Sequence, residues 1–491
     1  MSTASVPAIQ AQKLFIAGEW RDGAGGKTFN TINPATDEVI ATIASAEKED
    51  VDAAVAAARQ AFDERGSAWN KMSAADRGRL LWKMADLIEK NIDEFARLET
   101  LDNGKPIFES RYVDMPMVVE VFQYYAGWAT KILGETIPAK GNYFNYTLRE
   151  PVGVVAAITP WNFPLLLASW KIAPALAAGN TVIHKPASLT PLTALKLASI
   201  AQEAGVPPGV FNVITGKGAT VGDALVEHTG VDKIAFTGST EVGREVMRKA
   251  AGTVKRVSLE LGGKSPNIVF ADADLDAAAR GAYLGIFYGK GEVCAAGSRL
   301  FVEESVHDQL MEKLIARTKK LQPADPLDPK TRLGALVSEG QLNSVLRYIE
   351  SGKNEGGHLV TGGERAQVNG KGSFLQPTIF DRVLPDMTIA REEIFGPVLA
   401  TLSFKDVNDG LRQANETMYG LAAAVWTRDI KKAHRAAREL KAGTVWINTY
   451  NVYDPSMPFG GYKQSGFGRE LGMQALDLYT QTKSVWVDLN E

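Results

Sequence analysis

The sequence predicts an α/β protein with two domains. The chain has 491 residues, and single hydrophobic cores stop growing at about 250 to 300 residues, so two or three domains are expected. From about residue 150 short apolar runs alternate with helical runs, and a second series begins near residue 260. Apolar strands joined by helical crossovers are typical of parallel sheets covered on both faces. The simplest interpretation is two α/β domains with a cleft between them.

The segment 45–130 predicts helices that precede the first sheet. Its apolar residues recur at helical spacing, beginning with Val51, Ala54, Val55, Ala58 and Phe62. A second run opens at Ser73, with Asp76 three residues later as a variant of the capping box, and its buried face is Leu80, Leu81, Met84, Leu87 and Ile88. Gly104 is the expected end of a helix.

Four strand and helix pairs are predicted between residues 153 and 252, which indicates a doubly wound domain. The strands are GVVAAITP, TVIHKP, FNVITG and KIAFTG, and the helices that follow them are FPLLLASWKIAPALAAGN, TPLTALKLASIAQEAG, TVGDALVEH and STEVGREVMRKAAG. In the second series the strands are NIVF, SRLFVEE, LAAAVWT and GTVWINT, with helices such as HDQLMEKLIARTKKL between them. Domains of this class often bind nucleotides at the carboxyl ends of their strands.

Two β-type segments fit neither series. Residues 135–150 alternate like a hairpin around Gly141 and Asn142, and the chain ends in TKSVWVDLNE. Edge strands at a terminus usually find a partner, which favours contacts between copies of the chain. A strand added to the protein's own sheet is the alternative.

The composition excludes several classes of function. With 54 basic and 57 acidic side chains, nothing attracts nucleic acid or an anionic membrane by charge. Neither a signal sequence nor an apolar run of membrane-spanning length is present, so a cytoplasmic location is expected. One cysteine cannot form an intramolecular disulfide, and the five histidines have no paired spacing that suggests a metal site.

Glycine spacing alone is a weak dinucleotide signal. Gly216, Gly218 and Gly222 are one residue too long for the G-x-G-x-x-G pattern, and FTGSTEVG offers Gly238 and Gly243 without the central glycine. The segment GGKS hints at a phosphate loop, but that motif needs a glycine where the chain has a serine, at position 258. FTGSTEVG still predicts a strand that runs into a helix N-terminus, where backbone N–H groups can bind a pyrophosphate.

Seven motifs lie in order along the chain: TPWNFPL (159–165), HKPAS (184–188), FTGSTEVG (236–243), LELGGKSPNIVF (259–270), GEVCAAGSR (291–299), EEIFGPV (392–398) and PFGGYKQSGFGRE (458–470). Together they resemble the aldehyde dehydrogenase superfamily, over essentially the whole chain. The resemblance implies a Rossmann-like cofactor domain (1–128 and 149–260), a second α/β catalytic domain (261–470) and a small β oligomerisation hairpin, with oligomerisation segments at 129–148 and 478–491. It also implies a homodimer or homotetramer.

The resemblance assigns three catalytic residues. Cys294 takes the role of the nucleophile, whose thiolate adds to the aldehyde and leaves a thioester after hydride transfer; an inert buried thiol is the alternative. Asn162 and the backbone N–H of Cys294 resemble the donors to the oxyanion, each worth about 3 kcal/mol. Glu260 resembles the base that activates water. Relatives that acylate coenzyme A generally lack this carboxylate, so that reaction is a disfavoured alternative, as is a catalytically silent binding protein on the same fold.

The resemblance also implies a site for NAD(P)+. Lys185 corresponds to the residue that holds the adenosine ribose, Trp161 and Ser239 to wall and phosphate contacts, and Glu393 and Phe395 to the grip on the nicotinamide ribose. Other residues placed at this site are Ile158, Pro160, Gly218, Gly222, Phe236, Gly238, Gly243 and Leu261. Members that prefer NAD often carry glutamate where this chain has Ser188. Without that carboxylate a 2′-phosphate is not repelled, so NADP is expected to be tolerated or preferred.

The positions that resemble the substrate tunnel are apolar and aromatic: Phe163, Leu167, Trp170, Tyr288, Val293, Tyr450, Tyr453 and Phe459. Core packing is the alternative role for such residues. No arginine among them could hold a carboxylate, which favours uncharged aliphatic or aromatic aldehydes as substrates.

The chain departs from the superfamily just before the cysteine. Where the family commonly has Asn-Gln-Gly-Gln, this chain has Gly289, Lys290, Gly291 and Glu292. A nearby carboxylate raises the pKa of a thiol and a nearby ammonium lowers it. One hypothesis is therefore that Glu292 delays formation of the thiolate, and that Lys290 offsets this effect.

Overall fold

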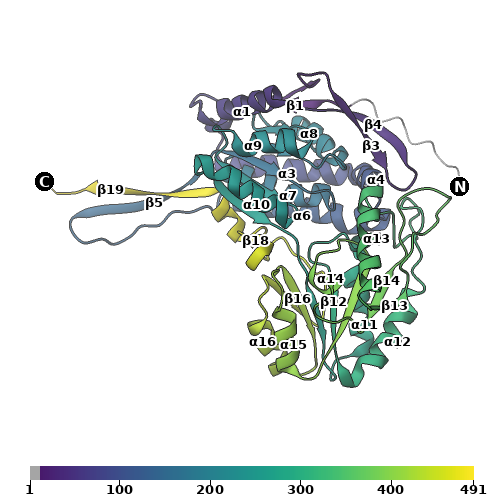
Figure 1. The fold of residues 1–491 in the computed structure, drawn as a ribbon. Coiled ribbons are helices and arrows are strands. Elements are labelled where there is room, and N and C mark those ends of the chain that lie inside the picture. The colour runs from purple at the N-terminus through teal and green to yellow at the C-terminus, as the bar shows by residue number, and fades with distance from the viewer. Residues whose placement is uncertain (1–11, 491) are drawn as a thin grey trace.

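A computed structural model describes residues 12–490 and contains two α/β bodies and a projecting two-stranded ribbon (Figure 1). This architecture confirms the predicted fold class. Residues 1–11 and 491, which belong to the first and last predicted segments, lie outside the described residues.

The first body contains an eight-stranded sheet in the order β18-β10-β9-β6-β7-β8-β1-β2. Its five central strands are parallel: β6 (Val154–Ile158), β7 (Thr181–Lys185), β8 (Phe211–Val213), β9 (Lys233–Thr237) and β10 (Arg256–Glu260). The crossovers are α7 (Pro164–Ala178), α8 (Leu192–Ala204), the short α9 (Asp223–Glu227) and α10 (Thr240–Ala250). The four predicted strand and helix pairs are confirmed, because each apolar run is buried on both faces.

The N-terminal region adds the strands β1 and β2 to this sheet and packs helices against it. Its strands are β1 (Leu14–Ile16), β2 (Glu19–Arg21), β3 (Thr28–Asn33) and β4 (Glu38–Ala44), and its helices are α1 (Lys48–Asp63), α2 (Ala68–Lys71), α3 (Ala74–Lys90), α4 (Ile92–Asn103), α5 (Ile107–Glu109), η1 (Ser110–Asp114) and α6 (Met115–Trp128). Ser73 caps α3 as predicted, since its hydroxyl oxygen accepts a bond from Asp76 N–H. The same hydroxyl also donates to the Asp76 carboxylate. This side-chain bond takes the place of the capping-box bond from the Ser73 backbone N–H to the Asp76 carboxylate. Gly104 ends α4 in the left-handed conformation, as predicted.

The second body contains a seven-stranded sheet in the order β13-β14-β15-β12-β11-β16-β17. Its strands are β11 (Pro266–Val269), β12 (Arg299–Glu303), β13 (His358–Thr361), β14 (Thr378–Asp381), β15 (Val398–Phe404), β16 (Ala422–Trp426) and β17 (Thr444–Ile447), and all pairs except β13 with β14 are parallel. The helices are α11 (Leu275–Phe287), α12 (His307–Thr318), α13 (Glu339–Asn354), α14 (Thr388–Arg391), α15 (Val407–Asn415) and α16 (Ile430–Glu439). The predicted second series is confirmed.

The chain crosses between the bodies twice near the site. It passes from β10 to β11 through residues 261–265, and it returns when β18 (Gly466–Phe467) pairs with β10. The last residues of the predicted catalytic range, 261–470, therefore belong to the first sheet.

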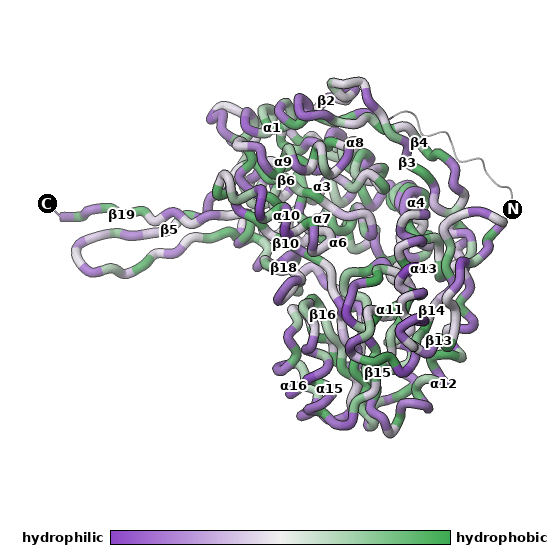
Figure 2. The backbone as a smooth tube through the Cα atoms, viewed as in Figure 1, coloured by the Kyte–Doolittle hydropathy of each residue, from purple (hydrophilic) through white to green (hydrophobic). Residues whose placement is uncertain are grey.

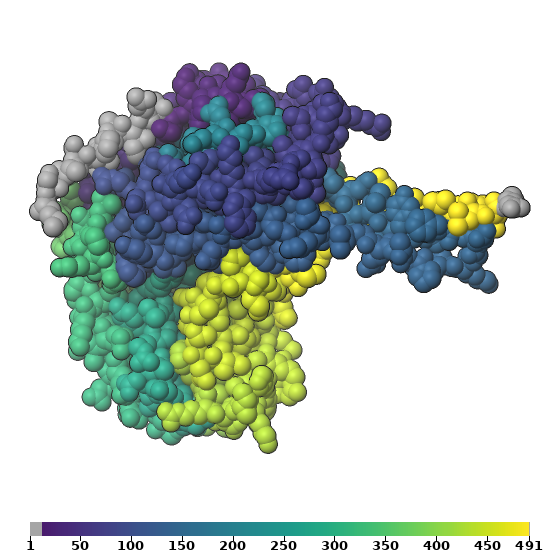
Figure 3. All heavy atoms as spheres, turned by 180° about the vertical axis from the view of Figure 1, so that it is seen from behind, coloured from purple at the N-terminus to yellow at the C-terminus, as the bar shows by residue number. Residues whose placement is uncertain are grey.

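The ribbon consists of β5 (Tyr143–Pro151) and β19 (Thr480–Asp488), paired antiparallel over nine residues. It forms a sheet of its own and projects from the first body (Figures 1 and 3). The hairpin around Gly141 is partly formed, since Thr147 N–H donates to Glu135 O and Thr136 bridges to Tyr146. Hydrophobic and hydrophilic positions alternate along the ribbon, whereas hydrophobic positions concentrate inside the two bodies (Figure 2).

Candidate active site

The residues predicted to bind a cofactor gather at one edge of the first sheet. Because the central strands are parallel, their carboxyl ends meet there. Residues from the strand ends and the loops after them lie along this edge: Ile158, Pro160 and Trp161 after β6, Lys185 and Ser188 after β7, Gly218 and Gly222 after β8, Phe236, Gly238 and Ser239 after β9, and Leu261 after β10. Glu393 and Phe395 reach the region from the second body, where the Phe395 ring lies 5.1 Å from that of Trp161.

Close packing explains one of the predicted glycines. A Cβ at Gly243, in the first turns of α10, would lie 2.5 Å from the Leu261 side chain. The glycine therefore brings the N-terminal end of α10 close to the end of β10. Ser239 caps this helix by accepting a bond from Val242 N–H, and helix geometry leaves the amides of Thr240 and Glu241 without an intrahelical acceptor.

A cleft of about 610 Å³ opens between α10 and the second body. Ser239 and Glu393, two of the predicted cofactor residues, line it. Ten further lining residues were not predicted: Thr240, Glu241, Arg244, Tyr348, Arg391, Glu392, Glu416, Thr417, Met418 and Tyr419. Arg244 lies four residues after Thr240 of the FTGSTEVG motif, so the 3.6-residue period of the helix could have indicated it.

The cleft and its edge fit a dinucleotide cofactor. Free helix N–H groups and arginines are suited to a pyrophosphate. Lys185 is buried, and burial lowers its pKa to about 8 while its Nζ donates to Pro186 O at 2.9 Å. The remaining N–H groups of Lys185 are available to donate to a ribose hydroxyl, as the predicted ribose contact requires. The Ser188 hydroxyl donates to Gly216 O at 2.7 Å.

A second cavity, of about 260 Å³, contains the other predicted set. All eight predicted tunnel residues line it together with Cys294. Six further lining residues were not predicted: Val113, Asp114, Met117, Leu166, Leu284 and Asn451. Asp114 carries the one charge among the lining side chains and is ion-paired with the buried Lys105 at 2.6 Å. The cavity wall is therefore aromatic and close to neutral.

Cys294 lies where the two bodies meet. A Cβ at Gly263, in the passage from β10 to β11, would lie 2.5 Å from Cys294 O, so only glycine admits this contact. Burial raises the pKa of the Cys294 thiol to about 12, and the carboxylates of Glu393 and Glu260 add to the effect. The resting thiol is therefore protonated at neutral pH.

The charge of Glu292 is paired with a lysine and is not among the main causes of the shift in the Cys294 pKa. Its Oε2 is ion-paired with Lys290 Nζ at 2.7 Å, and its Oε1 accepts a bond from Val337 N–H. The hypothesis that Glu292 controls the pKa of Cys294 is replaced, because the acidic neighbours that raise this pKa are Glu393 and Glu260. A paired carboxylate has little net field at the sulfur.

Asn162 contacts the turn before the cysteine, and the charge of Glu260 acts on the thiol. The Asn162 side chain donates to Glu292 O at 2.9 Å, which leaves its second N–H available. Both carboxyl oxygens of Glu260 are buried without a hydrogen bond in the described part of the chain. Burial, followed by the charge of Glu470, raises the Glu260 pKa well above its ordinary value. An unpaired buried carboxyl next to a thiol is suited to proton transfer.

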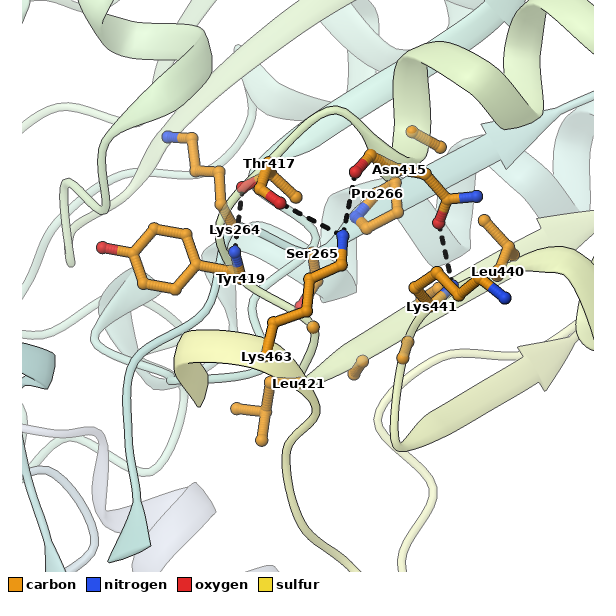
Figure 4. Close-up of a pocket in the computed structure, with 15 residues that line it drawn as sticks. Lys264, Ser265, Pro266, Asn415, Thr417, Tyr419, Leu421, Leu440, Lys441 and Lys463 are labelled. Atoms are coloured by element: carbon orange, nitrogen blue, oxygen red, sulfur yellow. Dashed lines mark hydrogen bonds between the residues drawn. The ribbon is translucent and has the colours of Figure 1, made fainter. Parts of the chain in front are cut away.

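A small pocket near the GGKS segment is structural. Lys264 and Ser265 line it, and Lys463 Nζ closes it by donating to the carbonyls of Asn415 and Thr417 at 2.9 and 3.1 Å (Figure 4). Its volume of about 10 Å³ holds about one water molecule, so it is not a nucleotide site.

Fold and site define the class: a two-domain α/β enzyme with a cysteine between a dinucleotide-sized cleft and an aromatic cavity. The model of the Aldehyde dehydrogenase family matches residues 20–485. The chain belongs to the aldehyde dehydrogenase family, and it is therefore an oxidoreductase that acts on aldehydes. No helix in residues 12–490 is long and apolar enough to cross a membrane.

Relatives of known name cover nearly the whole chain. The mitochondrial aldehyde dehydrogenase of Homo sapiens is 52% identical over 98% of this chain and 93% of its own length. Retinal dehydrogenase 2 of Homo sapiens is 49% identical over 98% and 92%. The NAD+ complex of an aldehyde dehydrogenase from Bacillus cereus has a TM-score of 0.96 at 51% identity and covers 98% of this chain and 97% of that one. An indole-3-acetaldehyde dehydrogenase of P. syringae reaches 0.95 at 47%, covering 97% and 96%.

Proposed function

We propose that the chain oxidises uncharged aliphatic or aromatic aldehydes to carboxylic acids through a thioester on Cys294. The observation that supports this most is the cavity, since one hollow collects Cys294 and all eight residues predicted to contact substrate. Its nearly neutral aromatic wall favours an uncharged substrate. Relatives of similar identity are named for retinal and for indole-3-acetaldehyde, so identity alone does not select the aldehyde.

The position of each residue supports its proposed catalytic role. The Cys294 sulfur adds to the carbonyl carbon, and its proton passes to Glu260, whose raised pKa makes it a stronger base than an ordinary carboxylate. The free N–H of Asn162 and the Cys294 backbone N–H donate to the oxygen that becomes negative. NAD(P)+, when bound, supplies the acceptor for the hydride. Glu260 then releases this proton to solvent and takes a second proton from the water that hydrolyses the thioester.

The cofactor is proposed to be NAD(P)+, with NADP+ tolerated or preferred. The similar Bacillus cereus enzyme is named as an NAD+ complex, and the neutral side chain of Ser188 removes a source of repulsion against a 2′-phosphate. A preference for NAD over NADP in kcat/KM above about a thousandfold, equal to about 4 kcal/mol, would contradict the second part.

A panel of aldehydes, assayed at 340 nm with NAD and NADP in parallel, tests the proposal. We expect turnover of uncharged aldehydes, loss of turnover in Cys294→Ala, and a free acid as product whether or not coenzyme A is added. A coenzyme A thioester as product would favour the acylating alternative. Cofactor binding without turnover of any aldehyde would favour a silent protein.

The ribbon is proposed to join copies of the chain into a homodimer or homotetramer. Its exposed aromatic residues, which include Phe144 and Trp486, support this role. A cytoplasmic location remains a prediction from the sequence, and cell fractionation tests it.

A further inference from the structure

A closed ring of buried contacts surrounds the amide that is proposed to bind the oxyanion. The Asn162 side chain donates to Glu292 O at 2.9 Å. The Glu292 carboxylate is ion-paired with Lys290 Nζ at 2.7 Å, and Lys290 Nζ donates to Asn103 O at 2.7 Å and to Asn103 Oδ1 at 2.9 Å. Asn103 Nδ2 closes the ring through Trp161 O at 2.7 Å and Asn162 O at 3.4 Å.

The ring joins three separate parts of the chain. Asn103 is the last residue of α4, Asn162 lies in the loop between β6 and α7, and Lys290 and Glu292 lie in the turn before the cysteine. All four side chains are nearly inaccessible to solvent. A buried ion pair with these hydrogen bonds has few alternative arrangements, because each displaced group would lose its partner in a medium of low polarity.

The backbone of Lys290 provides an independent observation. Its φ is +62°, in the left-handed region that a residue with a side chain adopts at a cost. The neighbouring Gly289 and Gly291 have φ values of +56° and +72°. Three successive left-handed residues set the direction of the Glu292 carbonyl, which is the acceptor for Asn162. The side-chain contacts of Lys290 stabilise this unfavourable turn.

We infer that Lys290 and Glu292 are positioning residues for the proposed oxyanion donor. Together they hold the Glu292 carbonyl against one N–H of Asn162, so that the second N–H is aimed before substrate binds. The inference rests on the proposed function, and it gives a shared purpose to the two charged residues among the three that depart from the family pattern. The charges of Lys290 and Glu292 compensate each other, so replacing either residue alone should lower kcat.

A double-mutant cycle tests the inference. Lys290→Gln and Lys290→Arg are each made in the wild-type chain and in Asn162→Ala, and kcat is measured with a good aldehyde from the panel. We expect each change to lower kcat by about tenfold or more in the wild-type chain but by less than about twofold in Asn162→Ala, with KM for NAD+ unchanged. Lys290→Arg keeps the charge, so it carries the test if Lys290→Gln does not fold.

A neutral pair and a remote pair serve as comparisons. Lys290→Gln combined with Glu292→Gln restores the two glutamines of the common family pattern, with Gly289 unchanged, and should recover kcat to within about threefold of the wild-type value. Asp381→Asn breaks the buried pair with His307, at 3.0 Å, which lines neither the cleft nor the cavity. This variant should lower the melting temperature and leave kcat unchanged.

The possible failures are distinct. If Lys290→Gln and Lys290→Arg lower kcat by the same factor in both backgrounds, the ring has a structural role alone and the inference is wrong. If the neutral pair does not recover activity, the compensation of the two charges is wrong. If Asn162→Ala does not lower kcat, the oxyanion role in the proposed function fails, and the inference fails with it.

Discussion

At the scale of single residues, the ionisation of Cys294 depends on where the carboxylates lie rather than on how close they are in sequence. Glu292 is two residues away but its charge is paired with Lys290. Glu260 and Glu393 are 34 and 99 residues away along the chain. Burial is the largest cause of the raised pKa of the thiol, and the charges of these two carboxylates add to it. The effect follows three-dimensional distance, since Coulomb energy does.

Neutralising Glu393 should make the thiol ionise at lower pH. Removing a negative charge favours the thiolate, so the Cys294 pKa falls and the alkaline rise in reactivity moves down, by about half a unit or more. The rate of alkylation by iodoacetamide, measured against pH without cofactor in Glu393→Gln, reports this shift. Glu392→Gln is the matched control, because that exposed carboxylate bonds to the Tyr348 hydroxyl and should leave the profile in place.

Introducing a carboxylate at position 188 should change the preference of the enzyme between NAD and NADP. The Ser188 hydroxyl bonds to Gly216 O next to the predicted adenosine site. Ser188→Glu adds a charge that repels a 2′-phosphate, so kcat/KM with NADP should fall by about tenfold or more relative to NAD. Leu189→Glu adds the same charge at the next, exposed position and should change the ratio less. An unchanged ratio in Ser188→Glu would place the adenosine ribose elsewhere.

At the scale of elements, the connection from β10 to β11 brings the site together. It begins after Glu260, passes the pair Gly262 and Gly263, and enters the second sheet. Gly263 N–H donates to Glu393 Oε1 at 3.0 Å, and Cys294 O packs against the same glycine. One short connection therefore touches the proposed base, the nucleophile and a cofactor residue.

Adding a methyl group at Gly263 should reduce activity far more than it reduces stability. A Cβ there would lie 2.5 Å from Cys294 O and displace the nucleophile, and misplacement by about 1 Å costs about a hundredfold in rate. Gly252→Ala is the control, since no atom lies within 4 Å of its added Cβ. The measurements are kcat and the melting temperature of both variants. Equal kcat in the two variants would show that the close contact has no catalytic importance.

At the scale of the whole molecule, two bodies form the site and the ribbon lies outside both. The exposed fractions of Phe144 and Trp486 are 49% and 62%, which is high for large apolar side chains on a two-stranded sheet. Two strands alone are marginally stable in water, so cover from another copy of the chain would explain the ribbon's length.

Making the ribbon polar should therefore change the oligomeric state. We expect Phe144→Ser combined with Trp486→Ser to shift the mass measured by light scattering toward that of one 53.0 kDa chain. Lys483→Ser, on the same ribbon, should leave the mass of the oligomer unchanged. If the wild-type chain is itself monomeric, the proposed oligomer is wrong.

Much of the fold was predictable because its signals are local. The apolar strand runs and the cap at Ser73 depend on neighbours within a few residues, and each appears where expected. The proposed roles of Cys294, Asn162 and Glu260 came from a resemblance of seven motifs. The pairing of β5 with β19 was not predicted, since strands 330 residues apart leave no mark of their partner in a local pattern.

The sequence by itself determined the class of fold, the family and the residue types available for chemistry, because periodicity and motifs survive without coordinates. Only the tertiary structure decided which charges act on Cys294. Burial and pairing are properties of space, so a carboxylate two residues away is neutralised by Lys290 while two distant ones raise the thiol's pKa. For the same reason, only the folded structure shows that Lys290 and Glu292 form a ring of contacts with Asn103 and Asn162.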